Sequence, residues 1–179
     1  MGILRPPRPV KLIASIFSHD ISWLQRSIEE LSRDYGNLDF ISEILSFDKT
    51  DYYSKEMGEN LKRRFLSFEV LFKPEVLKDI KLYTNRLEKK YADKGKRRVN
   101  IDPGYLSLGA LILASTKEAA YRPYLGKGIY ADLTLIYNSG GFQGLDWTYP
   151  DYLDVKVIHI MNQIREKYKF QLKEGKNRP

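Results

Sequence analysis

Two kinds of apolar periodicity alternate along this chain, and their order limits the folds that it can adopt. Apolar residues are nearly continuous over residues 10–17, as in a buried strand, and then recur every three or four positions over residues 21–35, as on one face of a helix. The spacing changes to alternate positions over residues 65–72 and returns to helical spacing over residues 76–91. The chain therefore mixes strands and helices, which excludes an all-helical or all-strand fold.

The remaining apolar segments extend this order. Short strands are expected at residues 40–47, 99–101, 106–114 and 129–137, and a C-terminal helix from about residue 152 to residue 170. The resulting order, βαββαβββα, begins with the six elements of a ferredoxin-like fold. We therefore expect an α+β protein with a mostly antiparallel sheet and helices packed on one face, in which a ferredoxin-like βαββαβ core carries extra strands and a C-terminal helix.

A chain of 179 residues, 42% of them hydrophobic, is long enough for one domain with a substantial core. We expect a single domain over residues 1–179, with residues 1–9 as an extended lead-in and residues 172–179 as a basic tail. The absence of cysteine excludes disulfides and thiolate metal sites. Because no apolar run reaches the roughly 20 residues that span a bilayer, we expect a soluble cytoplasmic protein without a membrane partner.

The net charge of +7 is concentrated at the two ends of the chain. Residues 1–11 contribute +3 and residues 165–179 contribute +4, which leaves 21 bases and 21 acids between them. Basic ends of this kind are typical of solvated tails, and a nucleic-acid-binding face is the alternative. The charge therefore gives only weak support to a nucleic-acid partner.

The segment Asn-Ile-Asp-Pro-Gly-Tyr, residues 100–105, predicts a turn between two strands. Pro103 fixes φ at the second position of a type II turn, and Gly104 allows the positive φ at the third. Asp102 could there face a cation or a ligand hydroxyl, or transfer a proton, and Tyr105 could stack on a ligand. The alternative is a turn without a functional role.

Three cations could together form an anion site. Lys117 closes an apolar strand behind Ser115 and Thr116, Arg122 follows it, and Lys127 stands between two glycines, where the backbone can approach a phosphate closely. The alternatives are that the Gly-Lys-Gly sequence is a hairpin turn and that Lys117 is solvated. The spacing GxxxxGK[ST] is absent, so the sequence contains no P-loop.

Three acidic residues are candidate ligands for a metal ion. Asp51, Glu56 and Glu69 carry carboxylates, which Mg²⁺ prefers, and this ion often binds beside phosphates. Asp51 and Glu56 are also, with Asp102, the candidates for proton transfer. No DxD spacing accompanies them, and a solvated position is the alternative for Glu69.

Aromatic residues near the predicted strand ends could bind a base or a sugar. Trp147 begins the segment Trp-Thr-Tyr-Pro-Asp-Tyr before the C-terminal helix, and Tyr130 and Tyr105 lie in or beside predicted strands. Such rings stack on bases regardless of sequence. The alternative is that Trp147 anchors the C-terminal helix to the core.

Residues 73–98 form a basic internal stretch with ten bases and four acids. The stretch covers a predicted helix and the loop after it, so its charges could form an RNA- or protein-binding surface or only a solvated helix face. The aromatic Gly-Phe spacing of an RNA-recognition motif is absent.

Taken together, these polar and aromatic blocks resemble a bacterial family known as domain of unknown function 4416. The resemblance runs from Pro9 to Tyr152, and its strongest parts are Thr50-Asp-Tyr-Tyr with Glu56-Met-Gly, Asn100-Ile-Asp-Pro-Gly-Tyr, Leu113-Ala-Ser-Thr-Lys and Tyr124-Leu-Gly-Lys-Gly-Ile-Tyr. It implies no activity, and a GTPase function lacks support because the guanine-reading NKxD pattern is also absent.

We therefore expect a binding site for an anionic or phosphorylated, nucleotide-like small molecule, with catalysis left open. Lys117, Arg122 and Lys127 would bind the anion, and Tyr105, Tyr130 and Trp147 would stack on the ligand. This hypothesis requires the blocks to converge in space, with Lys127 and Asp102 on the same side of the fold. The alternatives are an RNA- or protein-binding module that uses residues 73–98 and the basic termini, and a structural adaptor.

Overall fold

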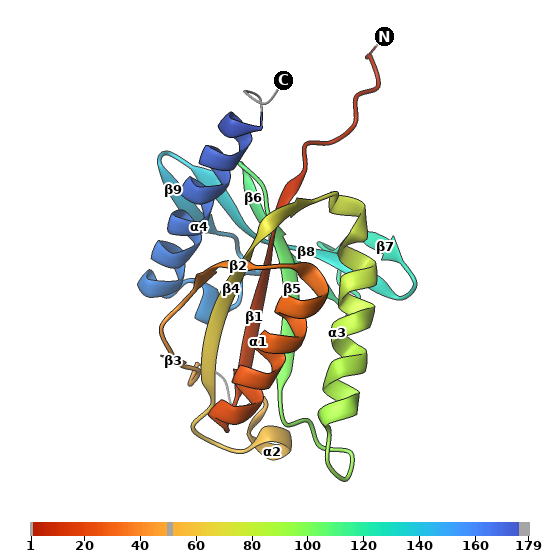
Figure 1. Ribbon diagram of the computed structural model, residues 1–179, viewed down its shortest axis with the longest axis vertical. Coiled ribbons are helices and arrows are strands. Elements are labelled where there is room, and N and C mark those ends of the chain that lie inside the picture. The colour runs from red at the N-terminus through yellow and green to blue at the C-terminus, as the bar shows by residue number, and fades with distance from the viewer. Residues whose placement is uncertain (1, 50–51, 176–179) are drawn as a thin grey trace.

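The computed structural model describes residues 2–49 and 52–175 (Figure 1). The strands in this part of the chain are β1 (Val10–Ser18), β2 (Leu38–Ile41), β3 (Leu45–Ser46), β4 (Lys62–Phe72), β5 (Asn100–Leu106), β6 (Ala110–Ser115), β7 (Tyr124–Gly126), β8 (Ile129–Asn138) and β9 (Gly141–Gly144). The helices are α1 (Ile21–Tyr35), α2 (Ser54–Met57), α3 (Leu77–Tyr91) and α4 (Val155–Glu174), and the 3-10 turns are η1 (Pro74–Val76) and η2 (Pro150–Tyr152).

All the strands belong to one sheet in which every pairing is antiparallel. The order is β2-β4-β1-β5-β6-β8-β7, with β3 beside β4 and β9 beside β8. The prediction of an α+β fold with a mostly antiparallel sheet and a C-terminal helix is therefore confirmed. None of the helices within residues 2–49 and 52–175 is both long and apolar enough to cross a membrane.

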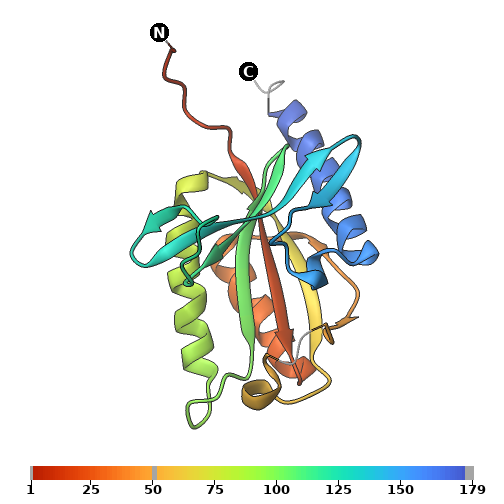
Figure 2. The same cartoon turned by 180° about the vertical axis from the view of Figure 1, so that it is seen from behind.

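Helices cover both faces of the sheet, which corrects the prediction that they share one face. Alternate residues of β1 point to opposite faces. Leu12 and Ile16 pack with α1 and α3, whereas Ile13 packs with α4. Figure 1 shows α1 and α3 in front of the strands, and Figure 2 shows them behind. The apolar stripe of a helix identifies its buried side but does not say which face of the sheet it will cover.

Strand β1 is central, and all nine of its residues are buried. Its only charged residue, Lys11, forms an ion pair with Asp39 and donates a hydrogen bond to Gln171 at 2.8 Å. A buried charge is stable only when it is paired in this way. Lys11 therefore ties the centre of the sheet to the C-terminal end of α4.

Residues 100–106 form one continuous strand, so the predicted turn at Pro103-Gly104 is wrong. The strand boundaries shift with it, because the connection between β5 and β6 lies at residues 107–109. Gly104 is needed for a close approach between strands, since a Cβ atom there would lie 2.6 Å from the carbonyl oxygen of Ile112. The same residue types that favour a turn here permit tight strand packing.

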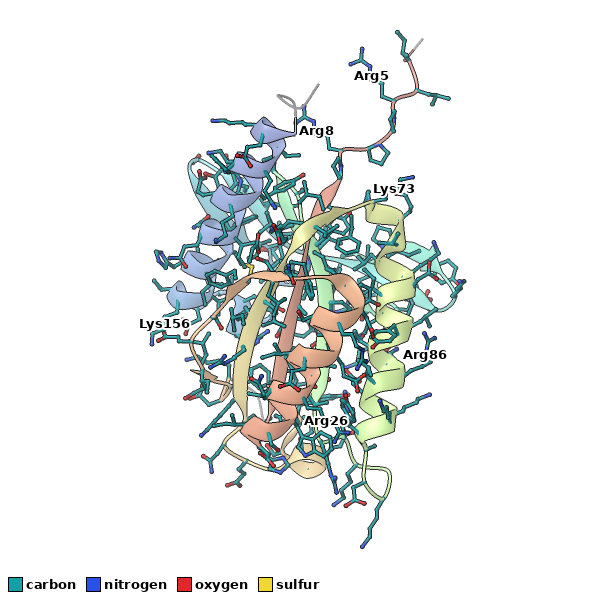
Figure 3. All side chains as sticks on the ribbon, in the orientation of Figure 1. Arg5, Arg8, Arg26, Lys73, Arg86 and Lys156 are labelled. Atoms are coloured by element: carbon teal, nitrogen blue, oxygen red, sulfur yellow. The ribbon has the colours of Figure 1, made fainter. Side chains whose placement is uncertain are left out.

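The C-terminal boundary of the domain differs from the one expected from the sequence. Helix α4 continues to Glu174, so residues 172–174 belong to a helix and not to a tail. Residues 2–9 form no regular element, as expected, and Figure 3 shows Arg5 and Arg8 on this segment, away from the sheet.

The short strands β7 and β9 were not predicted, because three or four residues carry little periodicity.

The sheet opens between β5 and β6. Strand β5 pairs with β1 over its whole length but with β6 only over Gly104–Leu106. Residues 100–103 therefore have a free edge toward β6, meaning an edge that pairs with no strand of the described chain, and Pro103 has no N–H to donate there. Figure 2 shows the β7–β8 hairpin extending past α3, away from β1. This divergence of strands creates the space described next.

Candidate functional site

A cavity of about 1000 Å³ opens beside the free edge of β5. Its walls include the start of β5, the end of β6, residues 81–89 of α3, the loop that follows α3, residues 52–53 and residues 149–152. The size suits a small organic ligand, since ligand pockets commonly enclose about 300–1000 Å³. Several of the polar blocks seen in the sequence meet here although they are far apart along the chain.

The described lining of the pocket carries more positive than negative charge. Its cations are Lys49, Arg63, Lys81, Lys89, Arg97, Lys117 and Arg122. Its acids are Glu88, Asp102, Asp132 and Asp151. The seven cations exceed the four acids by three charges, and such an excess in a partly enclosed site favours an anionic ligand.

Asp102 lies on the free edge of β5 and faces the pocket. It accepts a hydrogen bond from Asn100 Nδ2 at 2.7 Å and forms an ion pair with Lys81 Nζ at 3.1 Å. Lys81 comes from α3, and its side chain is almost completely buried. The position of Asp102 thus depends on the divergence of the strands, which lets a helix side chain reach the edge of β5.

Arg97 holds the loop after α3 against the pocket. It donates to both carboxylate oxygens of Glu56, at 2.7 and 2.6 Å, and to Asn100 Oδ1 at 2.5 Å. These hydrogen bonds to Arg97 lower the pKa of the Glu56 carboxyl. Glu56 therefore acts as the anchor of Arg97, which joins α2 to the pocket wall.

Glu88 is a site residue that sequence reasoning missed. It is only 6% exposed, and it accepts a hydrogen bond from the backbone N–H of Ile101 at 2.6 Å. Burial raises the pKa of Glu88 to about 7, although Lys81 acts in the opposite direction. The signal was present, because Glu88 and Lys81 follow the core residues Leu87 and Ile80 on the buried side of α3.

Arg122 joins two of the predicted blocks. It is ion-paired with Asp132 at 2.7 Å, and both side chains are buried. Its Nη1 donates to the carbonyl of Lys117 at 3.1 Å, and its Nη2, which also contacts Asp132, donates to the hydroxyl of Tyr149 at 2.9 Å. Arg122 therefore fixes the segment after β6 and the segment before α4 on the same side of the pocket.

Lys117 is the most accessible of the predicted cations at the pocket. Its Nζ lies 3.2 Å from the hydroxyl of Tyr52 and 4.3 Å from the centre of that ring. Within the described parts of the chain, Lys49, Lys89 and Lys117 form no ion pair with a carboxylate. Their charges are thus not neutralised by a protein group in this region.

Two other predicted residues lie outside the pocket lining, in the β7–β8 hairpin. Lys127 is at φ +56° in the turn and forms an exposed ion pair with Asp79 at 2.8 Å. Tyr130 packs on Tyr124 with 5.1 Å between the ring centres. The Gly-Lys-Gly sequence is therefore a hairpin turn, which was one of the two alternatives.

Tyr105 and Trp147 also lie away from the pocket lining. Tyr105 packs beside the buried Leu77 of α3. Trp147 stacks on Tyr121 at 4.9 Å and donates its indole N–H to the carbonyl of Leu133 at 2.8 Å. The aromatic side chains that line the pocket are instead Phe17, Phe47, Tyr52, Tyr53, Tyr149 and Tyr152.

The candidate metal ligands do not come together among the described residues. Glu69 is exposed near the end of β4, whereas Glu56 precedes the start of that strand and is paired with Arg97. Asp51 lies outside the described residues. In the same part of the chain, no three His, Asp or Glu side chains are grouped so that they could bind a metal ion.

The fold and the pocket define an α+β protein with an open antiparallel sheet and a charged, aromatic-lined cavity at its divergent edge. A family model described as "Domain of unknown function (DUF4416)" matches residues 8–168, and the chain belongs to this family. The resemblance seen in the sequence blocks is thereby confirmed. No curated protein and no solved structure matches the chain significantly.

Proposed function

We propose that the pocket beside β5 binds an anionic small molecule, most simply a phosphorylated, nucleotide-like compound. The observation that carries this proposal is the set of three lysines, Lys49, Lys89 and Lys117, that line the cavity without a carboxylate partner in the described structure. Lysine ammonium groups at a cavity wall attract phosphate as point charges. The lysines come from different elements, so an anion between them would contact more than one side of the pocket.

The aromatic lining supports the nucleotide-like part of the proposal. Tyr52 is 63% exposed and Tyr149 is 43% exposed, so both present ring surface to a ligand. Stacking of a base on such a ring contributes about 1–3 kcal/mol and does not depend on which base is present. The position of Lys117 over the ring of Tyr52 places a cation and a stacking surface next to each other.

Replacing Lys117 by alanine is expected to weaken the binding of ADP about tenfold to a hundredfold. A hydrogen bond to a charged group contributes about 1.5–3 kcal/mol, and about 1.4 kcal/mol corresponds to a factor of ten in Kd. Isothermal titration calorimetry with ADP, preceded by a thermal-shift screen of nucleotides, measures this change. A ligand that binds only the folded protein raises the melting temperature in such a screen.

The matched control is Lys127→Ala, which removes an exposed lysine outside the pocket. Both variants lose one positive charge, so a nonspecific attraction of ADP to the basic protein would weaken equally in the two. We expect the Kd of Lys127→Ala to stay within about twofold of the wild-type value, since the charge it removes is exposed and screened. Equal losses in both variants, or no binding of any nucleotide, would contradict the proposed site.

An RNA- or protein-binding module built on residues 73–98 and the basic termini is the alternative proposal. Figure 3 shows Arg86 and Lys73 at the outer surface of the α3 region, which favours such a module. Four other cations of this stretch, Lys81, Lys90, Arg97 and Arg98, are engaged in ion pairs, which leaves less free charge for a partner. RNA binding that weakens steeply with salt and is unchanged in Lys117→Ala would favour the alternative.

We also infer that β1, β2, β4 and β5 form a ferredoxin-like core with α1 and α3, and that the pocket lies at the edge of this core. The order β2-β4-β1-β5, together with α1 and α3 on one face, supports it. On this view, the pocket forms where the additional strands β6 and β8 leave the edge strand of the core.

A further inference from the structure

The wall of the pocket contains two carboxyl groups in very different surroundings. Asp102 is ion-paired with Lys81 and hydrogen-bonded by Asn100, as described above. Glu88 accepts one backbone hydrogen bond at Oε1, and its Oε2 lies 3.8 Å from Arg97 Nη1, a distance too long for a hydrogen bond. The negative charge of Glu88 is therefore less stabilised by neighbouring groups than the negative charge of Asp102.

The charged groups that face Glu88 come from three elements. Lys81 lies two turns before Glu88 on α3, Asp102 lies on β5, and Arg97 lies on the loop after α3, where it is ion-paired with Glu56 of α2. The two cations favour the ionised carboxylate, whereas Asp102 and the burial of the site disfavour it. Lys81 is also paired with Asp102, and Arg97 is also paired with Glu56. Each cation therefore stabilises the negative charge of Glu88 less than an unpaired cation would.

We propose that Glu88 takes up a proton when the pocket binds an anion, so that ligand binding is coupled to protonation. This inference rests on the proposed function of the pocket. A bound anion adds negative charge close to the carboxylates of Glu88 and Asp102. The repulsion is relieved most easily when Glu88, which has fewer partners, becomes protonated. The proton comes from solvent, and the neutral carboxyl then has an O–H that can donate a hydrogen bond to the ligand.

The pH at which Glu88 titrates makes this coupling measurable. Its pKa of about 7 places the carboxyl close to half protonation near neutral pH, where an ordinary glutamate is ionised. A bound anion raises the pKa further, and the number of protons taken up is therefore largest at a pH between the pKa values of the free and bound states, above neutrality. Affinity for the anion must then fall as pH rises through this range, because the proton acts as a second ligand.

The test is calorimetry of ADP binding at about pH 8 in two buffers with different ionisation enthalpies. The phosphates of ADP are fully ionised at this pH, since their second pKa is about 6. We expect the wild-type protein to take up between about 0.3 and 1 proton per ADP bound, and Glu88→Gln, which keeps the acceptor for the N–H of Ile101, to take up none. Binding without proton uptake in the wild type would overturn the coupling while leaving the proposed function intact.

A second measurement uses only the wild-type protein, in case Glu88→Gln does not fold. The affinity for ADP is expected to fall severalfold between about pH 7.5 and pH 9, with a limit of tenfold per pH unit for one coupled proton. A flat profile would overturn the inference. Absence of ADP binding at every pH would instead contradict the proposed function, and it would contradict the coupling as well.

Discussion

Replacing Arg122 by methionine is expected to lower the free energy of unfolding by about 3–5 kcal/mol. The substitution leaves Asp132 as a charge without its partner, and the side chains of this pair are only 4% and 6% exposed. Removal of one member of a buried ion pair is costly because the remaining charge is not solvated. The loss also frees the carbonyl of Lys117 and the hydroxyl of Tyr149. Urea denaturation of the wild type and the variant measures the difference.

Two further variants separate burial of a charge from loss of an ion pair. Lys127→Met breaks the exposed pair with Asp79, whose side chains are 60% and 53% exposed, and is expected to cost less than about 1 kcal/mol. The double variant Arg122→Met with Asp132→Leu is expected to recover most of the lost stability, because no buried charge remains. If Arg122→Met alone lowers the free energy of unfolding by less than about 1 kcal/mol, the Asp132 carboxylate is not buried as described.

Gly104→Ala is expected to lower the free energy of unfolding by about 2–3 kcal/mol, as overpacking does in a close-packed interior. The added Cβ would lie 2.6 Å from the carbonyl oxygen of Ile112 and 2.7 Å from Leu113 Cδ2. Backbone atoms of a neighbouring strand cannot move aside as the end of a flexible side chain can. The substitution should therefore separate β5 from β6 at the point where their pairing begins, and denaturant titration gives its cost.

Gly109→Ala is the matched control for Gly104→Ala. Gly109 lies in the connection between the same two strands, and nothing would be within 4 Å of an added Cβ. We expect its stability to stay within about 0.5 kcal/mol of the wild type, as for most surface substitutions. Equal effects at the two glycines would mean that the close approach of β5 and β6 does not constrain position 104.

The fold was largely accessible from the sequence where apolar periodicity runs over many residues. The patterns at residues 10–17, 21–35 and 76–91 correspond to β1, α1 and α3. The error at Pro103-Gly104 has a local cause, because proline and glycine are as compatible with a tight turn as with an edge strand that approaches its neighbour closely. Only the long-range pairing of β5 with β1 and β6 distinguishes the two.

The part of the candidate site in which polar residues follow an apolar strand could be predicted from the sequence. Lys117 and Arg122 meet Asp102 at one pocket because β5 and β6 diverge there. Glu88 was missed because the apolar stripe of α3 was interpreted only as a packing face, although two charged residues, Lys81 and Glu88, lie beside it. Lys127 was grouped with the site because glycine-flanked lysines suit both phosphate contact and a hairpin turn, and the neighbouring Asp79 comes from a distant part of the sequence.

The central claim is that an anionic ligand binds beside the free edge of β5, and amide NMR with ADP tests it most directly. We predict that the largest shifts of the backbone amide signals, in a protein uniformly labelled with ¹⁵N, occur at residues 115–117, Asn100 and Tyr149, with little change at Lys127. Shifts confined to the β7–β8 hairpin or to the outer surface of α3, or no shift at saturating ADP, would contradict the account.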